Sequence, residues 1–194
     1  RIARRIHPVV VMSGAARRLE TIPQGRSARR RSLFTRQRFA MSRKLTTLVY
    51  ALRDGQVLMM YRRKDPNLGQ WIAPGGKVEL HESPAECAVR ELAEETGLRA
   101  AGRPELRIIV TETSPLPDWQ WLMFIYLVRE FSGELAGDGR EGDLAWVPVD
   151  RVHALDIPQA DAIFFPYVVD GSPGPISMKF EYDGNLRLQA WRIE

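Results

Sequence analysis

The chain has 194 residues, of which 44% are hydrophobic, and this length is enough for one domain with a full core. No apolar run approaches the roughly 20 residues that a membrane span requires, so we expect no membrane partner. The single cysteine, Cys87, excludes an intrachain disulfide and fits a reducing compartment. We therefore expect a cytoplasmic protein in which Cys87 is a small packed residue.

The net charge of +4 is unevenly divided along the chain. Residues 1–43 carry 12 Arg, no Lys and one acid, a balance of +11, whereas residues 44–194 carry 16 basic and 23 acidic residues, a balance of −7. The first segment lacks apolar periodicity and is rich in Arg, Ser and Gly, which predicts a basic, disordered N-terminal extension. The folded domain is expected over residues 44–194.

Three interpretations of this extension compete. An Arg-rich, acid-poor leader is typical of an organelle transit peptide. A basic arm is also typical of contact with nucleic acid. The third interpretation, which we favour, places the segment outside the functional domain, with Met41 as the natural start; the first residue of the chain, Arg1, is not a methionine.

The pattern of residues 44–194 predicts several strands, some of them joined in hairpins, and helices between them. Residues 45–53 and 56–63 read as two strands, and the Asp54-Gly55 pair between them is a strong hairpin signal. Further strands are predicted at 71–74, 105–113, 119–131, 144–147, 176–182 and 185–193, and helices at 148–155 and 159–169. Hairpins in place of βαβ crossovers predict an α+β fold, with a mixed sheet between helices in an α/β/α sandwich.

The stretch between residues 75 and 98 carries the clearest helix signal. Ser83 is a good N-cap, Pro84 suits the first helical position, Glu86 completes a capping box, and Gly97 suits a left-handed end. The buried stripe is expected at helical spacing on one face, at Ala85, Ala88, Val89 and Leu92.

Another face of this helix is electrostatically costly. Glu91, Glu94 and Glu95 are spaced i, i+3, i+4, so the three carboxylates meet and repel one another. Only Arg90 is close enough in sequence to compensate. Two interpretations follow: a solvated acidic face, which is the usual fate of a charge run, or a site for divalent cations, which prefer carboxylate oxygens.

The complete spacing favours the second interpretation. The stretch GGKVELHESPAECAVRELAEETGL resembles the Nudix box, with Gly76, then Glu82, then RELAEETGL beginning at Arg90. This resemblance implies a Nudix hydrolase, which splits a diphosphate linkage between a nucleoside diphosphate and another moiety. It also implies the Nudix fold, an α/β/α sandwich in which the box forms a loop–helix–loop.

The resemblance implies roles for the residues of the box. Mg²⁺, with Mn²⁺ as the alternative ion, is expected on Glu91, Glu94 and Glu95, with the Gly75 carbonyl as an extra ligand. Glu82 and Arg90 are expected to support these glutamates. Outside the box, Glu141 is either a further metal ligand or base, or an exposed loop acid.

Substrate contacts are expected on both sides of the box, at Arg62, Trp71, Ile72, Gly76, Lys77 and Asp161. Gly75 and Gly76 would let the backbone approach the ligand closely, and Lys77 would act as a point charge toward a phosphate. Arg62 either reaches a phosphate or is a solvated charge at the end of a strand.

The sequence around the box, including LTTLVYAL, GQWIAPGGK and FFPYVVDG, is similar in layout to MutT-type oxidised purine nucleoside triphosphatases. This similarity implies cleavage of a nucleoside triphosphate to a monophosphate and pyrophosphate, with 8-oxo-dGTP as the type of substrate. The base pocket departs from that pattern, because Trp71 is followed by Ile72 where the family has asparagine, and Ala160 and Asp161 stand in place of two aspartates. Asp161 is then either a base contact or a helix-surface acid.

Other classes are kept open. Within the enzyme class, the alternative substrates are sugar nucleotides and dinucleoside polyphosphates. A non-catalytic Nudix binding module usually lacks box glutamates, and all of them are present here. A nucleic-acid role would rest on the basic extension alone. The oligomeric state is left open by the sequence.

Overall fold

The computed structural model describes residues 42–136 and 139–194, so the prediction for the basic extension lies almost entirely outside the described residues. The domain begins with β1 (Lys44–Arg53) and β2 (Gln56–Arg62), which form the predicted hairpin. Asp54 and Gly55 have φ values of 51° and 72°. A tight two-residue hairpin turn of this type requires positive φ at both central positions, which explains why the Asp-Gly pair is a reliable signal.

The two strands of this hairpin soon separate. Only Leu52↔Val57 and Arg53↔Gln56 are paired between them. The rest of β1 pairs in parallel with β6 (Gln120–Val128), from Lys44↔Trp121 onward. β1 therefore lies in the middle of the sheet, and the space beside its N-terminal half is filled by the box loop, where Thr46 forms a bridge with Lys77.

The sheet has the order β10–β9–β5–β6–β1–β2–β3, with β8 also paired to β2. The remaining strands are β3 (Trp71–Ile72), β5 (Glu105–Thr113), β8 (Gly142–Pro148), β9 (Ile176–Tyr182) and β10 (Leu188–Ile193). β5 and β9 are parallel, like β1 and β6, whereas the other pairs are antiparallel. The prediction of a mixed sheet is confirmed.

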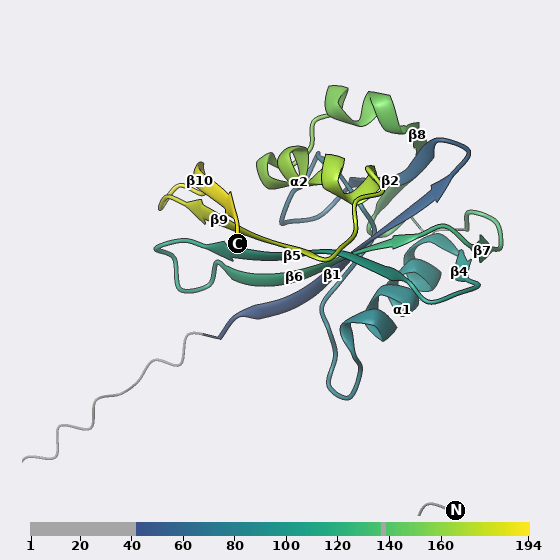
Figure 1. The fold of residues 1–194 in the computed structure, drawn as a ribbon, viewed down its shortest axis with the longest axis horizontal. Coiled ribbons are helices and arrows are strands. Elements are labelled where there is room, and N and C mark those ends of the chain that lie inside the picture. Colours follow the sequence, from purple (N-terminus) through teal and green to yellow (C-terminus); the bar gives the residue numbers. More distant parts are fainter. Residues whose placement is uncertain (1–41, 137–138) are drawn as a thin grey trace, which may run out of the picture. The chain divides into compact units, whose positions relative to one another are not determined.

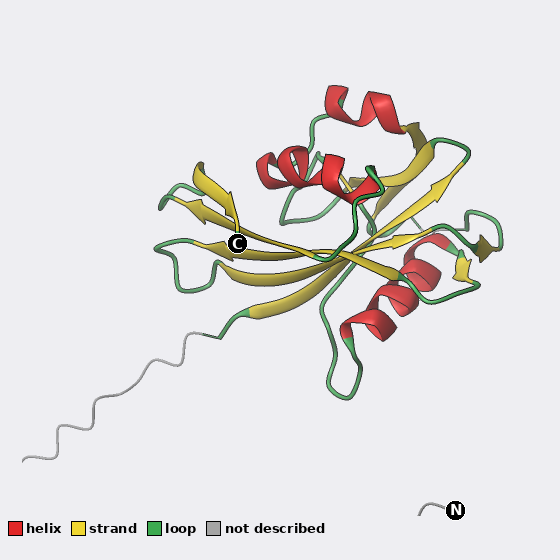
Figure 2. Ribbon diagram, viewed as in Figure 1, coloured by secondary structure: helices red, strands yellow, loops and turns green. Residues whose placement is uncertain are grey.

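Helices cover both faces of this sheet (Figures 1 and 2). α1 (Pro84–Thr96) packs on one face, and α2 (Gln159–Val169) and the 3-10 helix η1 (Val149–Ala154) lie over the other. The predicted α/β/α sandwich is therefore confirmed. Within the described residues, no helix has the length and apolar character that crossing a membrane would need.

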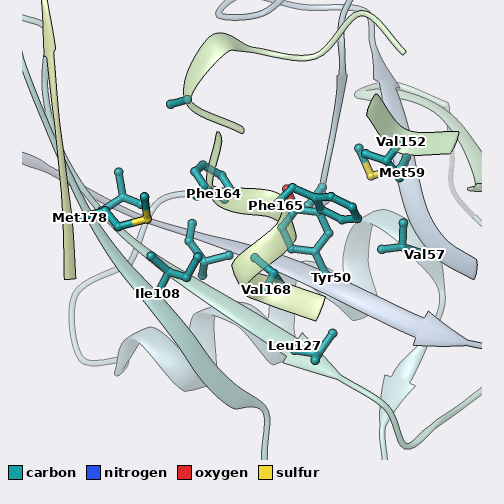
Figure 3. Close-up of a cluster of buried hydrophobic side chains, with 14 of the residues drawn as sticks. Tyr50, Val57, Met59, Ile108, Leu127, Val152, Phe164, Phe165, Val168 and Met178 are labelled. Carbon is teal, nitrogen blue, oxygen red and sulfur yellow. The ribbon is translucent and has the colours of Figure 1, made fainter. Parts of the chain in front are cut away.

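Alternate residues of β1 supply the two cores. Tyr50 faces α2, where its ring lies beside Phe165, and Phe164 and Val168 of α2 and Met178 of β9 belong to the same core cluster (Figure 3). The Tyr50 and Phe165 ring centroids are 5.4 Å apart. Burying each large apolar side chain of this kind stabilises the fold by about 1.5–3 kcal/mol.

The opposite core lies under α1. Val49 and Ala51 of β1 contact the buried Ala88 and Leu92 of α1, together with Leu98 just after the helix. The helix that carries the glutamates is thus fixed to the centre of the sheet.

The structure differs from the predictions mainly at element ends. The predicted strand 185–193 begins later, as β10, because the turn continues to Leu186, where φ is 58°. Asp183 Oδ1 accepts hydrogen bonds from Asn185 N and Arg187 N and so holds this longer turn. The sequence missed a two-stranded sheet of β4 (Arg99–Ala100) and β7 (Phe131–Ser132).

Candidate active site

The ends of α1 set the position of every glutamate on it. Ser83 Oγ accepts a hydrogen bond from Glu86 N at 3.3 Å, and Glu86 Oε2 accepts one from Ser83 N at 2.7 Å. Gly97 closes the helix with a φ of 77°. The predicted capping box and left-handed end are confirmed. Of the predicted buried stripe, Ala88 and Leu92 are buried, whereas Ala85 and Val89 are partly exposed.

Cys87 is buried on the same helix and packs against the sheet, as predicted. Its sulfur lies 3.3 Å from Thr47 Oγ1 of β1. Burial raises the pKa of the Cys87 thiol to about 11, so the group is neutral near pH 7. It serves as a packed side chain between helix and sheet.

Arg90 lies at the centre of the acidic face. Its Nε and Nη2 donate to the Glu82 carboxylate at 3.0 and 2.8 Å. Its Nη1 donates to Glu91 Oε1 at 2.8 Å and to Glu94 Oε2 at 3.2 Å. The Arg90 hydrogen bonds are the main reason that the pKa of Glu82 falls to about 2. Three of the four box glutamates are therefore held by one guanidinium.

Glu95 is held differently. Its Oε2 accepts a hydrogen bond from Gly75 N at 2.8 Å. Burial raises the pKa of Glu95 to about 7, and the neighbouring charges of Glu91 and Glu141 act in the same direction. Burial also raises the pKa of Glu91. These carboxylates are the ones for which a nearby positive charge would be most favourable.

The two glycines allow the box loop to pack closely. A Cβ on Gly75 would lie 2.1 Å from Thr47 O, and one on Gly76 would lie 2.1 Å from Glu91 Oε1. The sequence predicted a close approach to a ligand at Gly76. In the structure, both glycines allow close packing within the protein: Gly75 lies against β1 and Gly76 lies against the Glu91 carboxylate.

These groups line a cavity of about 520 Å³. Glu91, Glu94 and Glu95 project into it from α1. Most of the predicted ligand and phosphate residues lie around it. The lining residues are Met60, Arg62, Lys64, Gly75, Gly76, Lys77, Glu91, Glu94, Glu95, Gly139, Arg140, Glu141 and Gly142.

Cationic side chains also line the cavity. Arg62 and Lys64 come from the end of β2, and Arg140 and Glu141 come from the loop before β8. Glu141 Oε1 lies 2.6 Å from Lys64 Nζ, and Glu141 Oε2 lies 3.9 Å from Arg62 Nη1. Arg140 was not predicted from the sequence, where its only signal is its place beside Glu141.

Three residues expected to contact the substrate do not line this cavity. Trp71 is half-buried, with its ring 5.4 Å from that of Tyr61, and Ile72 is buried in the sheet. Asp161 lies on α2, 7% exposed, and its Oδ2 has no hydrogen-bond partner among the described residues. Burial, followed by the charge of Glu112, raises the pKa of Asp161 well above its usual value. The helix-surface interpretation of Asp161 is therefore wrong.

The donor set fits a hard divalent cation by its chemistry. Carboxylate oxygens from α1 and from Glu141 share one cavity, and these are the ligands that Mg²⁺ and Mn²⁺ prefer. Within residues 42–136 and 139–194, no three acidic, His or Cys side chains already converge as a metal site. Arg90 Nη1 donates to both Glu91 and Glu94, and Gly75 N donates to Glu95, so each of these carboxylates already accepts a hydrogen bond from the protein.

Known proteins match both the sequence and the fold. The NUDIX domain family model matches residues 42–168. An uncharacterised Nudix hydrolase of Bacillus subtilis is 28% identical over 144 residues, which are 73% of this chain and 88% of the relative. The 8-oxo-dGTP diphosphatase of Escherichia coli is 28% identical over 110 residues, 56% of this chain and 81% of the relative. The crystal structure of a MutT protein from Bacillus halodurans matches with a TM-score of 0.69 and 30% identity, over 78% of this chain and 97% of that chain.

Proposed function

Because the chain belongs to the Nudix family and is one of its MutT-like hydrolases, we propose that it cleaves a nucleoside triphosphate to a monophosphate and pyrophosphate in the presence of Mg²⁺. Mn²⁺ is the alternative ion. The observation that carries this proposal is the cavity that three α1 carboxylates line together with cationic side chains, namely Arg62, Lys64, Lys77 and Arg140. A polyphosphate and its counter-ions need both kinds of group in one place.

Glu91, Glu94 and Glu95 would hold the divalent ion, with the Gly75 carbonyl and Glu141 as further ligands. Such an ion screens the phosphate charge and polarises a phosphoryl oxygen. Arg90 keeps Glu91 and Glu94 in position through its hydrogen bonds and is in turn held by Glu82. These two residues position the carboxylates and do not line the cavity.

The phosphates would bind the cationic side of the cavity. Arg62 offers a planar guanidinium that is suited to two phosphate oxygens, and Lys77 offers a mobile point charge beside the box. Gly76 keeps the loop narrow at this point. Catalysis then depends on holding the scissile linkage in line and on stabilising its charge.

The base would bind toward α2, outside the phosphate cavity. Asp161 supports this assignment, because a buried carboxyl with an unpartnered oxygen is costly unless another group satisfies it. Trp71 would pack against the base, and Ile72 would give an apolar contact where related enzymes have asparagine. The likeness to a protein named as an 8-oxo-dGTP diphosphatase supports an oxidised purine as substrate.

A substrate panel tests the proposal. Purified protein is assayed with Mg²⁺ against canonical and oxidised nucleoside triphosphates, sugar nucleotides and dinucleoside polyphosphates, and kcat/KM is compared. We expect the highest value for an oxidised purine nucleoside triphosphate, with pyrophosphate as product. A higher value for a sugar nucleotide or dinucleotide would overturn the substrate assignment.

The Glu95→Gln variant tests the site itself. We expect turnover to fall by orders of magnitude with an unchanged circular dichroism spectrum, because the amide keeps the size of the side chain but loses its charge. Glu130→Gln, an exposed residue outside the cavity, is the matched control. Near-normal turnover of Glu95→Gln would rule out this site.

A further inference from the structure

Both oxygens of the Glu141 carboxylate are directed at cations. Oε1 is bonded to Lys64 Nζ at 2.6 Å, and Oε2 lies 3.9 Å from Arg62 Nη1. A carboxylate with one oxygen on each of two cations occupies the place that two phosphate oxygens would take. In this arrangement Glu141 is the ion-pair partner of Lys64 and Arg62 and is not grouped with the α1 glutamates.

The same carboxylate nevertheless shares the cavity with the glutamates of α1. Glu141 lines the cavity together with Glu91, Glu94 and Glu95, and its charge contributes to the raised pKa of Glu95. A rotation of one side chain within the cavity would therefore exchange one set of partners for the other. The ion pair that resists this rotation is weak, because the Lys64 and Glu141 side chains are 52% and 36% exposed.

The backbone that carries Glu141 is fixed by other contacts. Arg63 N donates to Glu141 O at 2.9 Å, and the Arg63 guanidinium donates to both Asp143 carboxylate oxygens at 2.8 and 2.9 Å. Arg63 is not among the residues that line the cavity, so a ligand there would leave these contacts intact. The Glu141 side chain can thus change partners while its loop stays in place.

We propose that Glu141 is a conditional metal ligand, held by Lys64 and Arg62 until substrate phosphates take over these two cations and release its carboxylate to the divalent ion. This inference rests on the proposed function, since it uses the same cavity. It adds Lys64 to the phosphate-binding residues. It also predicts that the metal site is complete only when a polyphosphate is present, so the divalent ion should bind more tightly to the loaded enzyme than to the unloaded one.

The test measures free Mn²⁺ by electron paramagnetic resonance, with and without inorganic pyrophosphate. In its absence, Glu141→Gln is expected to change the Mn²⁺ dissociation constant less than about twofold, and in its presence to weaken Mn²⁺ binding about fivefold or more. Equal weakening in both conditions would show a permanent ligand and would overturn the proposal. No weakening in either condition would show an exposed loop acid and would overturn it equally.

A double-mutant cycle gives the second measurement. Without pyrophosphate, Lys64→Gln is expected to tighten Mn²⁺ binding about fivefold, because Glu141 is released. In the Glu141→Gln background the same substitution should tighten it clearly less, since only the lost positive charge remains. Equal gains in both backgrounds would contradict the exchange of partners.

Two controls separate this inference from the proposed function. Arg151→Gln removes an exposed cation of η1 that does not line the cavity and should leave Mn²⁺ binding unchanged. Nucleotide hydrolysis by the unmodified chain is measured in parallel. Loss of the Mn²⁺ pattern with hydrolysis intact overturns the inference alone, whereas absence of hydrolysis of every nucleotide overturns the proposed function.

Discussion

Arg90 donates hydrogen bonds to the Glu82 carboxylate from two nitrogens, Nε at 3.0 Å and Nη2 at 2.8 Å. This leaves Nη1 free to donate toward the helix glutamates. The geometry depends on a planar guanidinium, because a lysine ammonium is a single point that cannot serve two sets of partners with fixed directions.

We therefore expect Arg90→Lys to keep the charge and lose the geometry. Supporting residues of this kind typically contribute about 10- to 100-fold in activity or metal affinity. Steady-state kinetics should show the loss mainly in kcat, with a melting temperature close to that of the unmodified chain. Arg151→Lys is the matched control. An Arg90→Lys variant with full kcat would show that charge alone is sufficient.

Gly76→Ala is expected to damage activity more than stability. Its new Cβ would lie 2.1 Å from Glu91 Oε1, the end of a flexible side chain that can move away. The Glu91 carboxylate must move by about 1 Å or more to relieve this contact, and a misplacement of about 1 Å at a catalytic group costs about 10²-fold in rate. Turnover and thermal melting should be measured together.

Gly142→Ala provides the contrasting case. There the Cβ would lie 2.2 Å from Tyr61 O, a backbone atom that cannot move without disturbing the β2–β8 pairing. We expect a clear loss of stability in this variant. Gly184→Ala, where nothing lies within 4 Å, should change neither property. A Gly76→Ala variant that unfolds like Gly142→Ala would contradict the prediction.

Stability should depend on pH through the buried carboxyl of Glu112. Burial raises its pKa to about 7 from the usual 4.5, although the Tyr182 hydroxyl donates to it at 3.0 Å. The folded state therefore binds more protons between these two values. The contribution of Glu112 to the free energy of unfolding should be fully present below pH 4.5 and should be lost as pH rises to about 7, by at most about 1.4 kcal/mol per pH unit.

Glu112→Gln should remove this part of the pH dependence, because the amide is neutral and can still accept from Tyr182. Chemical denaturation at several pH values would show the variant equal to the unmodified chain at low pH and more stable near pH 8. The raised pKa values of Asp161, Glu95 and Glu91 act in the same direction and should leave a residual slope. An unchanged slope in Glu112→Gln would exclude Glu112 as its source.

We propose that the domain spans residues 44–194 and that the basic extension before it is not needed for turnover. Deleting residues 1–40 should leave kcat/KM unchanged, and a large loss would contradict this proposal. If the extension binds nucleic acid, the full chain should show binding that weakens steeply with salt, and the truncated chain should not.

Local signals in the sequence predicted local structure well. Ser83 and Gly97 fix the ends of α1 through their own hydrogen bonds and dihedral angles, so their types carry the information. The Asp54-Gly55 hairpin is of the same kind. The carboxylates of the box are also brought together by helical spacing alone, as Glu91, Glu94 and Glu95 in the cavity lining illustrate.

Contacts between distant segments were not readable in the same way. Arg140 reaches the cavity because β8 pairs with β2, and no pattern around Arg140 indicates that pairing. For Asp161 the sequence left a base contact and a helix-surface acid open, and the fold of α2 places it in the core. Trp71 and Ile72 lie near the box in sequence, but the β3 pairing directs them away from the cavity.

The parallel pairing of β1 with β6 affects how the domain folds during synthesis. Residues 44–51 belong to the first strand of the described part of the chain to be synthesised, yet their partners in the folded sheet are residues 121–128. A contact so far apart in the chain is entropically expensive to form and slows folding. On the ribosome, the central strand must wait with one side unpaired until the middle of the chain has emerged, and during that interval the nascent domain is open to aggregation and to chaperones.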